Sequence, residues 1–495
     1  MDVQVYRVHP SGYPNISQQR FKLSTNDLLN RKPVYVPVCL FFRAPDESKH
    51  DTTQLLVAGL ERTLRQCRFL AGTIERDKAG DYYILSRQEG TVDFIHNRLD
   101  HDETGQLAFA SYDSLEANHF LIPNCSDKAH LRVQTLPYGQ GSADPGHSPP
   151  VIGVQANLIP GGIALAIHFH HWAMDYCALA GFVHQWAGNT YALTCHVPGP
   201  ELSPACLDRS RLLCKSHIAT DAQVTNDEKA PVQAEVAVAD SALVDSAVDP
   251  TENLSISVCL FHLSKSKAEA LKVLVTSEAG LDSCRISSYD AFVALWWRVL
   301  TRTRAKFQRL HSLDAVADFT EAVNLRRKLV PPLPDRYLGN AVLFATSATQ
   351  QHKLTLADVM ESASLGTIAT YIRSITNSVD AAFIEEQFDQ IERDRHQAAD
   401  VNQAHGAGSP LAFTVNDWRA HNVHDADFGF GRPTGLRHLF GVMPVLVVLP
   451  KKRVAGTLED VFEYLVPVEN AAMSGLLQDL DVREWFDFQG VESEP

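Results

Sequence analysis

The chain lacks the features that stabilise small disulfide-bonded or zinc-dependent proteins. Its nine cysteines are an odd number, lie scattered along 495 residues and form no CxxC pair. This pattern excludes a disulfide framework and a zinc ribbon. At about 100–200 residues per domain the length corresponds to two to four domains, which is enough chain to bury a large core.

Long apolar runs and an excess of positive charge are also missing. No run approaches the roughly 20 apolar residues that cross a bilayer, and the first segment, MDVQVYRVHP, has no apolar centre of a signal peptide. Asp and Glu number 59 against 44 Lys and Arg, a formal net charge of −15. Such a surface repels nucleic acid and anionic lipid, although a local basic groove for a phosphorylated cofactor is compatible with it. We therefore expect a cytoplasmic protein that binds neither nucleic acid nor membranes.

Aromatic residues are absent over one long stretch. Between Tyr191 and Phe261 there is no Phe, Tyr or Trp, and residues 220–252 are rich in Ala, Val, Asp, Glu and Pro. Aromatic side chains supply much of the buried area of a core, so this stretch is predicted to lie on the surface. We expect an N-terminal lobe at 1–200, a crossover linker at 201–255 and a C-terminal lobe at 256–495. Residues 138–150 are predicted to form a second surface loop.

Both lobes mix the periodicities of strands and helices. The patterns predict strands at 34–42, 81–86, 92–95 and 442–449, and a β-hairpin of 151–158 with 163–169. They predict helices at 53–66, after Asp175, at 287–302 with a serine cap, and at 371–395. Because strands and helices do not alternate strictly, an α+β fold with mixed sheets fits better than a doubly wound parallel sheet.

The segment 163–186 carries the most chemistry. It places His168, His170 and His171 at the end of a strand, and Asp175 follows one helical turn later. The histidines could be structural, or His168 and His170 could begin a metal site, but the ligands that should follow are missing. Alternatively, His171 is a single general base at the sheet end, and Asp175 fixes the local turn or the ring tautomer. We favour the general base, and since no nucleophile elbow is present we favour direct transfer over a covalent intermediate.

The pair His171 and Asp175 resembles the HxxxD motif of the BAHD acyltransferases. Further segments resemble motifs of that family and occur in the family's order. These are DFGFG at 427–431 for the family's DFGWG, VNLR at 323–326 with PPLP at 331–334 and GN at 339–340, ISSYDA at 286–291 with WR at 297–298, and weaker matches at 23–27 and 69–72.

The resemblance implies a two-lobed fold like that of chloramphenicol acetyltransferase, with a mixed sheet and flanking helices in each lobe and a tunnel between the lobes. It implies that acyl-CoA is the co-substrate, acetyl-CoA being the expected donor, with no metal and no tightly bound cofactor. It implies that His171 deprotonates the acceptor, that Asp175 orients the site with Arg326 as its partner, and that the protein is a monomer.

Other positions are assigned by the same resemblance. Asp427, Gly429 and Gly431 match a loop that shapes the fold, so losing Asp427 should lower activity through misfolding or misplacement. Ser287, Ser288 and Asn340 lie on segments that border CoA. Trp418 and Tyr176 are expected at the acceptor, and Tyr176 stands where many members have Gly.

The chain is most similar in style to the fungal branch, including trichothecene-type O-acetyltransferases. This suggests acetylation of a hydroxyl, rather than an amine, of a hydrophobic secondary metabolite. One alternative is a condensation-type enzyme that uses a carrier-bound thioester, which shares an HHxxxDG motif. The other is a non-catalytic binding protein on the same scaffold.

Overall fold

A computed structural model describes residues 3–30, 33–100, 109–122, 125–137, 143–214, 255–280, 285–306, 312–396, 411–454, 456 and 458–493. The predicted linker is therefore described only at 201–214 and at 255. Its aromatic-free centre, 220–252, lies outside the described residues, as do residues 138–142 of the predicted surface loop.

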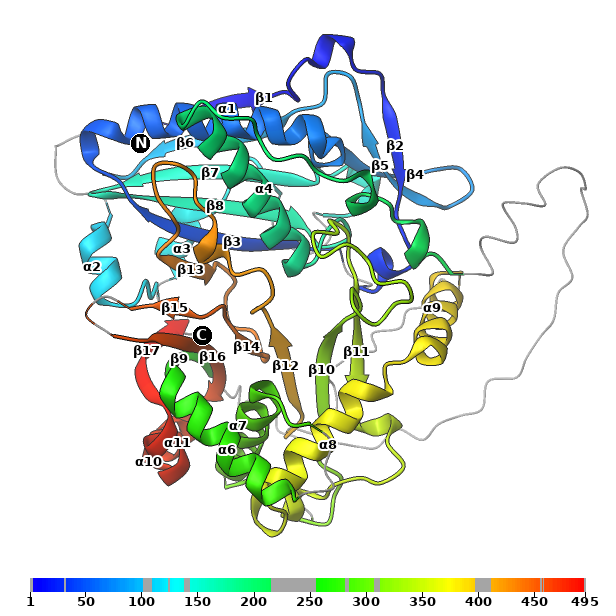
Figure 1. Cartoon of the computed structure of the whole chain (residues 1–495), viewed down its shortest axis with the longest axis vertical. Coiled ribbons are helices and arrows are strands. Elements are labelled where there is room, and N and C mark those ends of the chain that lie inside the picture. Colours follow the sequence, from blue (N-terminus) through cyan, green and yellow to red (C-terminus); the bar gives the residue numbers. More distant parts are fainter. Residues whose placement is uncertain are drawn as a thin grey trace, which may run out of the picture.

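Two lobes are visible in Figure 1, each built on a mixed sheet. The sheet of the N-terminal lobe has the order β1 (Val3–Val8), β6 (Val92–Arg98), β7 (Ile152–Ile159), β8 (Gly162–His170), β3 (Tyr35–Arg43) and β13 (Gly435–His438). The predicted hairpin is the antiparallel pair β7 and β8, whereas β6 and β7 are parallel. Strand β13 comes from the C-terminal part of the chain and pairs with β3, so the two lobes share this sheet. A small sheet beside it contains β2 (Gln19–Lys22), β5 (Tyr82–Ser86) and β4 (Thr73–Arg76).

Helices cover both faces of the N-terminal sheet. Apolar residues of α1 (Lys49–Gln66) and α4 (Tyr176–Thr194) share one core with alternate residues of β3, while α2 (Tyr112–Ala117) and α3 (Cys125–Leu131) lie against the other face. The two long helices approach closely because α1 has Gly59 opposite Thr190, where a Cβ atom would lie 2.0 Å from the threonine hydroxyl oxygen. This close contact, near the end of α4, holds α4 against α1.

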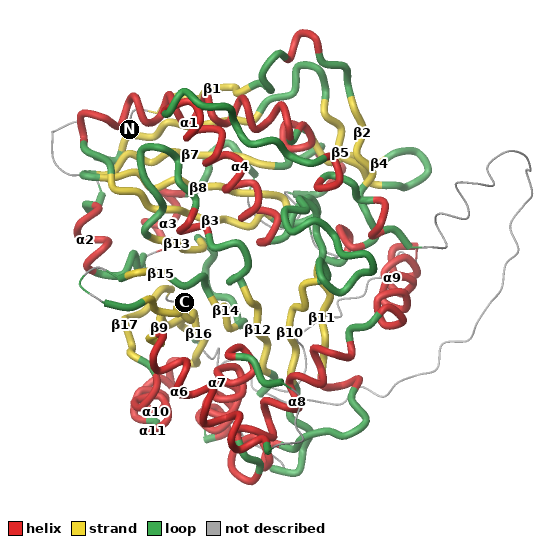
Figure 2. The backbone as a smooth tube through the Cα atoms, in the orientation of Figure 1, coloured by secondary structure: helices red, strands yellow, loops and turns green. Residues whose placement is uncertain are grey.

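The C-terminal lobe places its helices on one side of its sheet (Figure 2). The strand order is β11 (Val342–Thr346), β10 (Phe319–Asn324), β12 (Phe413–Asp417), β14 (Leu446–Val448), β16 (Asp460–Glu469), β9 (Ile256–Ser264) and β17 (Asp487–Ser493), with β15 (Lys452–Arg453) paired to β16. The helices are α6 (Lys265–Ala279), α7 (Ser288–Ala305), α8 (Leu365–Ser378), α9 (Ala381–His396), α10 (Asn470–Gln478) and α11 (Leu480–Trp485).

Strand β9 explains how the lobes join. Its residues Cys259 and Phe261 belong to the core beneath the helices, whereas Val258 and Leu260 belong to the core of the N-terminal lobe. Side chains alternate across a strand, so a strand that is apolar on both faces can pack against two layers. The C-terminal sheet is therefore buried between its own helices and the other lobe, which confirms the predicted two-lobed α+β fold.

Two predicted elements differ from the structure. The helix predicted at 371–395 is two helices, because Val379 has ψ of 81° and the Asp380 carboxylate accepts a hydrogen bond from the Phe383 amide at 2.9 Å, which starts α9. The strand predicted at 442–449 is only β14, since Pro444 has no amide hydrogen for a sheet and the residues before it do not pair.

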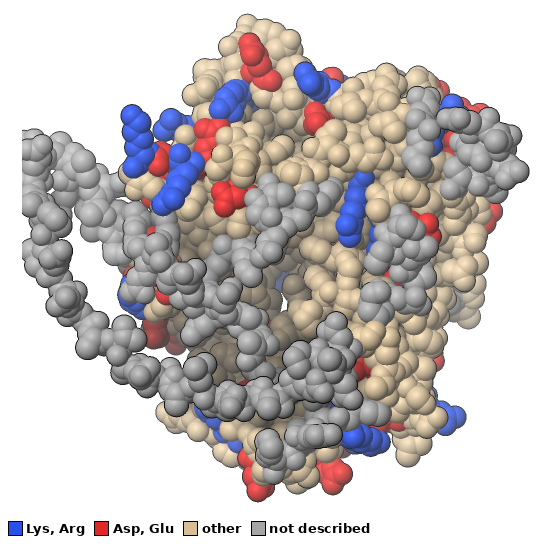
Figure 3. Space-filling view, turned by 180° about the vertical axis from the view of Figure 1, so that it is seen from behind, with Lys and Arg blue, Asp and Glu red and all other residues tan. Residues whose placement is uncertain are grey.

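The surface is mixed in charge. From behind, basic and acidic side chains are interspersed around a hollow near the middle of the view (Figure 3). Within the described part of the chain, no helix combines the length and the apolar character that crossing a bilayer requires.

Candidate active site

His171 is the first residue after β8, and its backbone is held from both lobes. Its amide donates a hydrogen bond to the Val34 carbonyl at 2.9 Å, and its carbonyl accepts one from the Asn340 side chain at 2.9 Å. The chain turns here because the Ala173 amide donates to the His170 carbonyl at 2.9 Å. The strand-to-helix turn therefore fixes the direction in which the His171 side chain leaves the backbone.

His168 and His170 point the other way, as the period of two predicts. Both are fully buried. The His170 ring bridges the turn, since its Nε2 donates to the Ala143 carbonyl at 2.9 Å and its Nδ1 accepts from the Trp172 amide at 3.1 Å. His170 thus supports the shape of the turn. Among the described residues, no three His, Cys, Asp or Glu side chains are grouped so that they could hold a metal ion.

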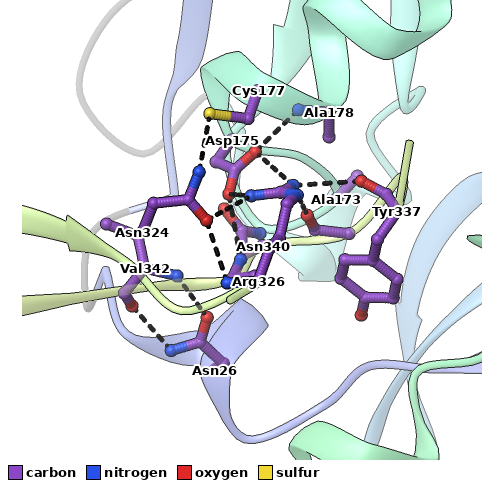
Figure 4. Close-up of polar contacts among 12 residues, drawn as sticks. Asn26, Ala173, Asp175, Cys177, Ala178, Asn324, Arg326, Tyr337, Asn340 and Val342 are labelled. Carbon is purple, nitrogen blue, oxygen red and sulfur yellow. Dashed lines mark hydrogen bonds and ion pairs between the residues drawn. The ribbon is translucent and has the colours of Figure 1, made fainter. Parts of the chain in front are cut away.

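Asp175 caps α4 and binds Arg326 across the two lobes (Figure 4). Its Oδ1 accepts from the Ala178 amide at 2.7 Å and from Arg326 Nη2 at 2.9 Å; its Oδ2 accepts from Arg326 Nη1 and from the Ala341 amide, both at 2.9 Å. Arg326 Nη2 also donates to the carbonyls of Tyr337 and Gly339 at 3.0 Å. Every strong acceptor position of the carboxylate is used, so Asp175 orients the turn and the opposite lobe.

A second buried ion pair lies beneath the same turn. Asp27 Oδ2 accepts from Arg209 Nη1 at 2.6 Å, and Arg209 Nη2 donates to the Ala173 carbonyl at 2.8 Å. Asp27 Oδ1 accepts from the Asn340 amide nitrogen at 3.0 Å, and Asn340 in turn holds the His171 carbonyl. Asn340, which the resemblance places on a segment that borders CoA, is 2% exposed and lies beneath the turn that carries His171.

The His171 ring lines a cavity between the lobes. Most of the wall is apolar, and three amide side chains and the carboxylates of Asp175 and Asp417 add polar groups. The lining includes Leu29, Asn30, Val36, Phe169, Tyr176 and Cys177 from the N-terminal lobe and Ala322, Asn324, Val342, Phe344, Asn416 and Trp418 from the C-terminal lobe. The Tyr176 and Trp418 rings are stacked with centroids 4.4 Å apart. The two residues predicted at the acceptor thus form one wall of the cavity that contains His171.

The protonation states follow from burial and charge. Burial lowers the pKa of His171 below its ordinary value, and the nearby Asp175 carboxylate only partly offsets this effect, so the imidazole is neutral at pH 7. Burial also opposes ionisation of Asp175, but the Arg326 charge and two backbone amides outweigh it and hold the pKa of Asp175 below its usual value. Nδ1 of His171 has no hydrogen-bond partner in the described part of the chain. A neutral imidazole that lines a cavity can accept a proton from a bound hydroxyl.

A basic hollow lies at the start of α7, on the far side of the Trp418 segment. Its lining includes Ser287, Ser288, Lys272, Arg285 and Arg419. Ser287 is the N-cap of α7 and shares its hydroxyl with Asp290 and Arg373. Arg419 donates to the Asp417 carboxylate at 2.7 Å, and Asp417 also lines the His171 cavity.

Part of the charge in this hollow is uncompensated. Arg373 and Arg419 are paired with Asp290 and Asp417. Lys272 and Arg285 have no ion-pair partner among the residues that the structure describes. A helix N-terminus with two such cations favours a phosphorylated ligand.

The DFGFG loop lies away from the His171 cavity. Gly429 has φ of +84°, its amide donates to Asp427 Oδ1 at 2.9 Å, and the Phe428 amide donates to the Gly431 carbonyl at 3.0 Å. Phe428 is fully buried against Trp186 of α4. Asp427, Gly429 and Gly431 thus form a tight turn that packs on the back of α4, and none of them lines the cavity.

Two residues that lie near His171, Arg209 and Asn324, were not identified as site residues from the sequence. Arg209 falls within the predicted linker, where nothing marked it as a partner of Asp27. Asn324 belongs to the VNLR segment, and its amide donates to the Cys177 sulfur at 3.4 Å beside the cavity. Nothing in a polar segment of sequence indicates that one arginine, Arg209, will be buried in an ion pair. Only a multiple alignment would have singled out Asn324.

Comparisons with known proteins bear on the family and the fold of this chain. A model of the transferase family matches residues 4–478. Acetyltransferase FGR3 of Gibberella zeae is 33% identical over 99% of this chain and 94% of its own length, and Trichothecene 3-O-acetyltransferase of Saccharomyces cerevisiae is 24% identical over 83% and 85%. The solved structure of F. graminearum TRI101 with coenzyme A and T-2 mycotoxin covers 95% of this chain and 100% of its own, with 19% identity and a TM-score of 0.71, which confirms the fold. The chain belongs to the transferase family of BAHD acyltransferases and is an acyltransferase that transfers groups other than aminoacyl groups.

Proposed function

We propose that the protein transfers an acetyl group from acetyl-CoA to a hydroxyl of a hydrophobic secondary metabolite. The observation that carries the proposal is the neutral His171 ring, which lies half-buried at the junction of two lobes and lines a mainly apolar cavity. The acetyltransferase names of the two relatives support the acetyl donor. We expect the enzyme to act as a cytoplasmic monomer without a tightly bound cofactor.

In this reaction both substrates are bound at once. His171 removes the proton from the acceptor hydroxyl as its oxygen attacks the thioester carbonyl carbon. The new C–O bond gives a tetrahedral oxyanion; its collapse breaks the C–S bond, and the thiolate of CoA takes the proton back from the imidazolium. A positioned base of this kind contributes about 10²–10⁴-fold to the rate. Holding the two substrates together in a dry cavity contributes much of the rest.

The basic hollow supports CoA as the carrier of the acyl group. Lys272 and Arg285 offer uncompensated positive charge beside the N-terminus of α7, where Ser287 and Ser288 lie. Asp417 and Arg419 join this hollow to the His171 cavity, because each lines one of the two and they form an ion pair. CoA phosphates in the hollow would leave the thioester arm directed toward His171. The coenzyme A in the TRI101 structure is consistent with this arrangement.

The test is release of CoA thiol from acetyl-CoA, with and without a pooled extract of hydroxylated metabolites. We expect acceptor-dependent release by the wild type, lost about 10²–10⁴-fold in His171→Ala. His50→Ala, which changes an exposed histidine of α1, is the matched control and should retain full activity. Full activity in folded His171→Ala would contradict the proposal. A folded wild type that is silent with free acyl-CoAs but active with a carrier-bound thioester would replace it with a condensation-type function.

A further inference from the structure

Tyr176 carries a polar group that nothing in the described structure satisfies. It is the first residue of α4, follows Asp175 directly and lines the same cavity as His171. The residue is 7% exposed, and its hydroxyl is buried without a hydrogen-bond partner among the described residues. Burial raises the pKa of Tyr176 well above its ordinary value, so the hydroxyl keeps its proton and can donate.

The ring that carries this hydroxyl is held in place. It stacks on Trp418 with centroids 4.4 Å apart and planes only 7° apart. Trp418 is fixed in turn, because its amide donates to the Val448 carbonyl at 2.8 Å at the end of β12. One partner of the stack belongs to each lobe. The hydroxyl is therefore preorganised, and a ligand would not have to order it.

Its position in the cavity distinguishes Tyr176 from other tyrosines. Buried hydroxyls in folded proteins are nearly always paired, because an unpaired one loses its bonds to water. Tyr337, Tyr371 and Tyr464 also have buried hydroxyls without a partner among the described residues, but they lie in the core of the C-terminal lobe and do not line the cavity. Of these four, Tyr176 is the one that can gain its missing bond from a molecule in the cavity.

The surroundings indicate what that molecule offers. The cavity lining has apolar side chains, among them Val36, Phe169 and Phe344, and polar ones at Asn30, Asn416 and Asp417. Asp417 is paired with Arg419, and the amide of Asn324 already accepts from the Arg326 amide and donates to Cys177. An acceptor with an apolar skeleton would contact the apolar side chains, and an oxygen at the Tyr176 hydroxyl would supply the hydrogen bond that this hydroxyl lacks.

We propose that Tyr176 is a specificity-determining residue, whose hydroxyl donates a hydrogen bond to a second oxygen of the acceptor, distinct from the hydroxyl that is acetylated. The enzyme then selects apolar acceptors that bear at least two oxygens over those that bear one. This inference rests on the proposed function, since it assigns the His171 cavity to the acceptor.

The test compares menthol with menthanediol, which share an apolar skeleton and differ by one hydroxyl, as acceptors for acetyl-CoA. We expect the wild type to favour the diol in kcat/KM. Tyr176→Phe keeps the stack and should raise KM for the diol about five- to tenfold, leaving kcat and the values for menthol unchanged. Tyr464→Phe is the matched control and should change neither substrate.

Several results would overturn the inference. Equal kinetics of Tyr176→Phe and wild type on the diol would show that the hydroxyl does not contact the acceptor. An equal fall of kcat on both alcohols would place the hydroxyl at the reacting thioester instead. A wild type that releases CoA with pooled extract but acetylates neither alcohol would mean that the cavity selects something else. A wild type silent with every acceptor would refute the proposed function itself.

Discussion

The two motif aspartates of this chain lie in opposite surroundings. The Asp175 side chain is 10% exposed and is bound by Arg326 and two backbone amides. The Asp427 side chain is 39% exposed; it accepts from its own loop at Gly429 and from Arg432 at 3.3 Å. Asp175 joins two lobes and holds the turn that presents His171. Asp427 stabilises a local turn on the back of α4.

The difference shows that a motif position does not indicate how strongly its residue is bound. A buried charge that loses its partner is left unpaired in a medium of low polarity, whereas an exposed charge is rehydrated. Substitutions at the two sites should therefore differ in size although the residues are identical.

The largest effect is expected at the buried pair. Asp175→Asn leaves the Arg326 charge without its partner and should lower the free energy of unfolding by about 3–5 kcal/mol, with loss of activity. Urea denaturation measures it. Adding Arg326→Met removes the stranded charge and should recover part of the stability. A loss below about 1 kcal/mol, or no recovery in the double variant, would contradict the role given to this pair.

The pH profile separates His171 from an exposed histidine. Because burial lowers the pKa of His171, kcat/KM should fall about tenfold per pH unit only below a midpoint lower than the roughly 6.5 of a free imidazole. The residual activity of His171→Ala should lack this dependence. A midpoint at or above 6.5 would contradict the lowered pKa of His171.

The stability of the fold should also decrease as the pH is lowered. The pKa values of buried His168 and His170 are lowered to about 3 and about 4. The unfolded chain therefore binds protons more tightly than the folded one, and stability falls as the pH drops from about 6.5 toward these values. Urea denaturation at several pH values measures this loss.

A glycine substitution tests whether the DFGFG loop acts through packing. At Gly429 φ is +84°, and an added Cβ would lie 2.8 Å from the Thr194 hydroxyl oxygen and 3.1 Å from the Tyr191 Cα. Gly429→Ala should lower the free energy of unfolding by about 1–3 kcal/mol in a urea titration. Gly12→Ala is the control, since Gly12 has φ of +76° with nothing within 4 Å. Equal losses at both sites would mean that backbone strain, and not contact with α4, sets the cost.

The smallest effect is expected at Asp427. Asp427→Asn keeps an oxygen for the Gly429 amide and removes only an exposed ion pair, so stability should change by less than about 1 kcal/mol. The predicted fall in activity should be correspondingly small. Thermal unfolding and the CoA-release assay measure both. A loss as large as that of Asp175→Asn would erase the contrast between the two aspartates.

The sequence alone predicted the features that depend on neighbours along the chain. The turn of the β7–β8 hairpin, the start of α4 after Asp175 and a serine cap on α7 are as predicted; the structure places that cap at Ser287. Each involves residues a few positions apart, so periodicity and capping rules apply to them directly. The prediction of a single helix at 371–395 was wrong because the cap at Asp380, within an otherwise helical pattern, was not recognised.

What only the tertiary structure decided is which distant groups meet where the family resemblance gave no guide. The resemblance named Arg326 as the partner of Asp175, 151 positions away, but nothing paired Arg209 with Asp27, 182 positions away. The stack of Tyr176 on Trp418 likewise joins two lobes. The sequence determined that His171 follows a strand and that an aspartate caps the next helix. Packing of the two sheets decided that this histidine is neutral, half-buried and open to a cavity, because burial and charge depend on atoms that the chain brings together only when it folds.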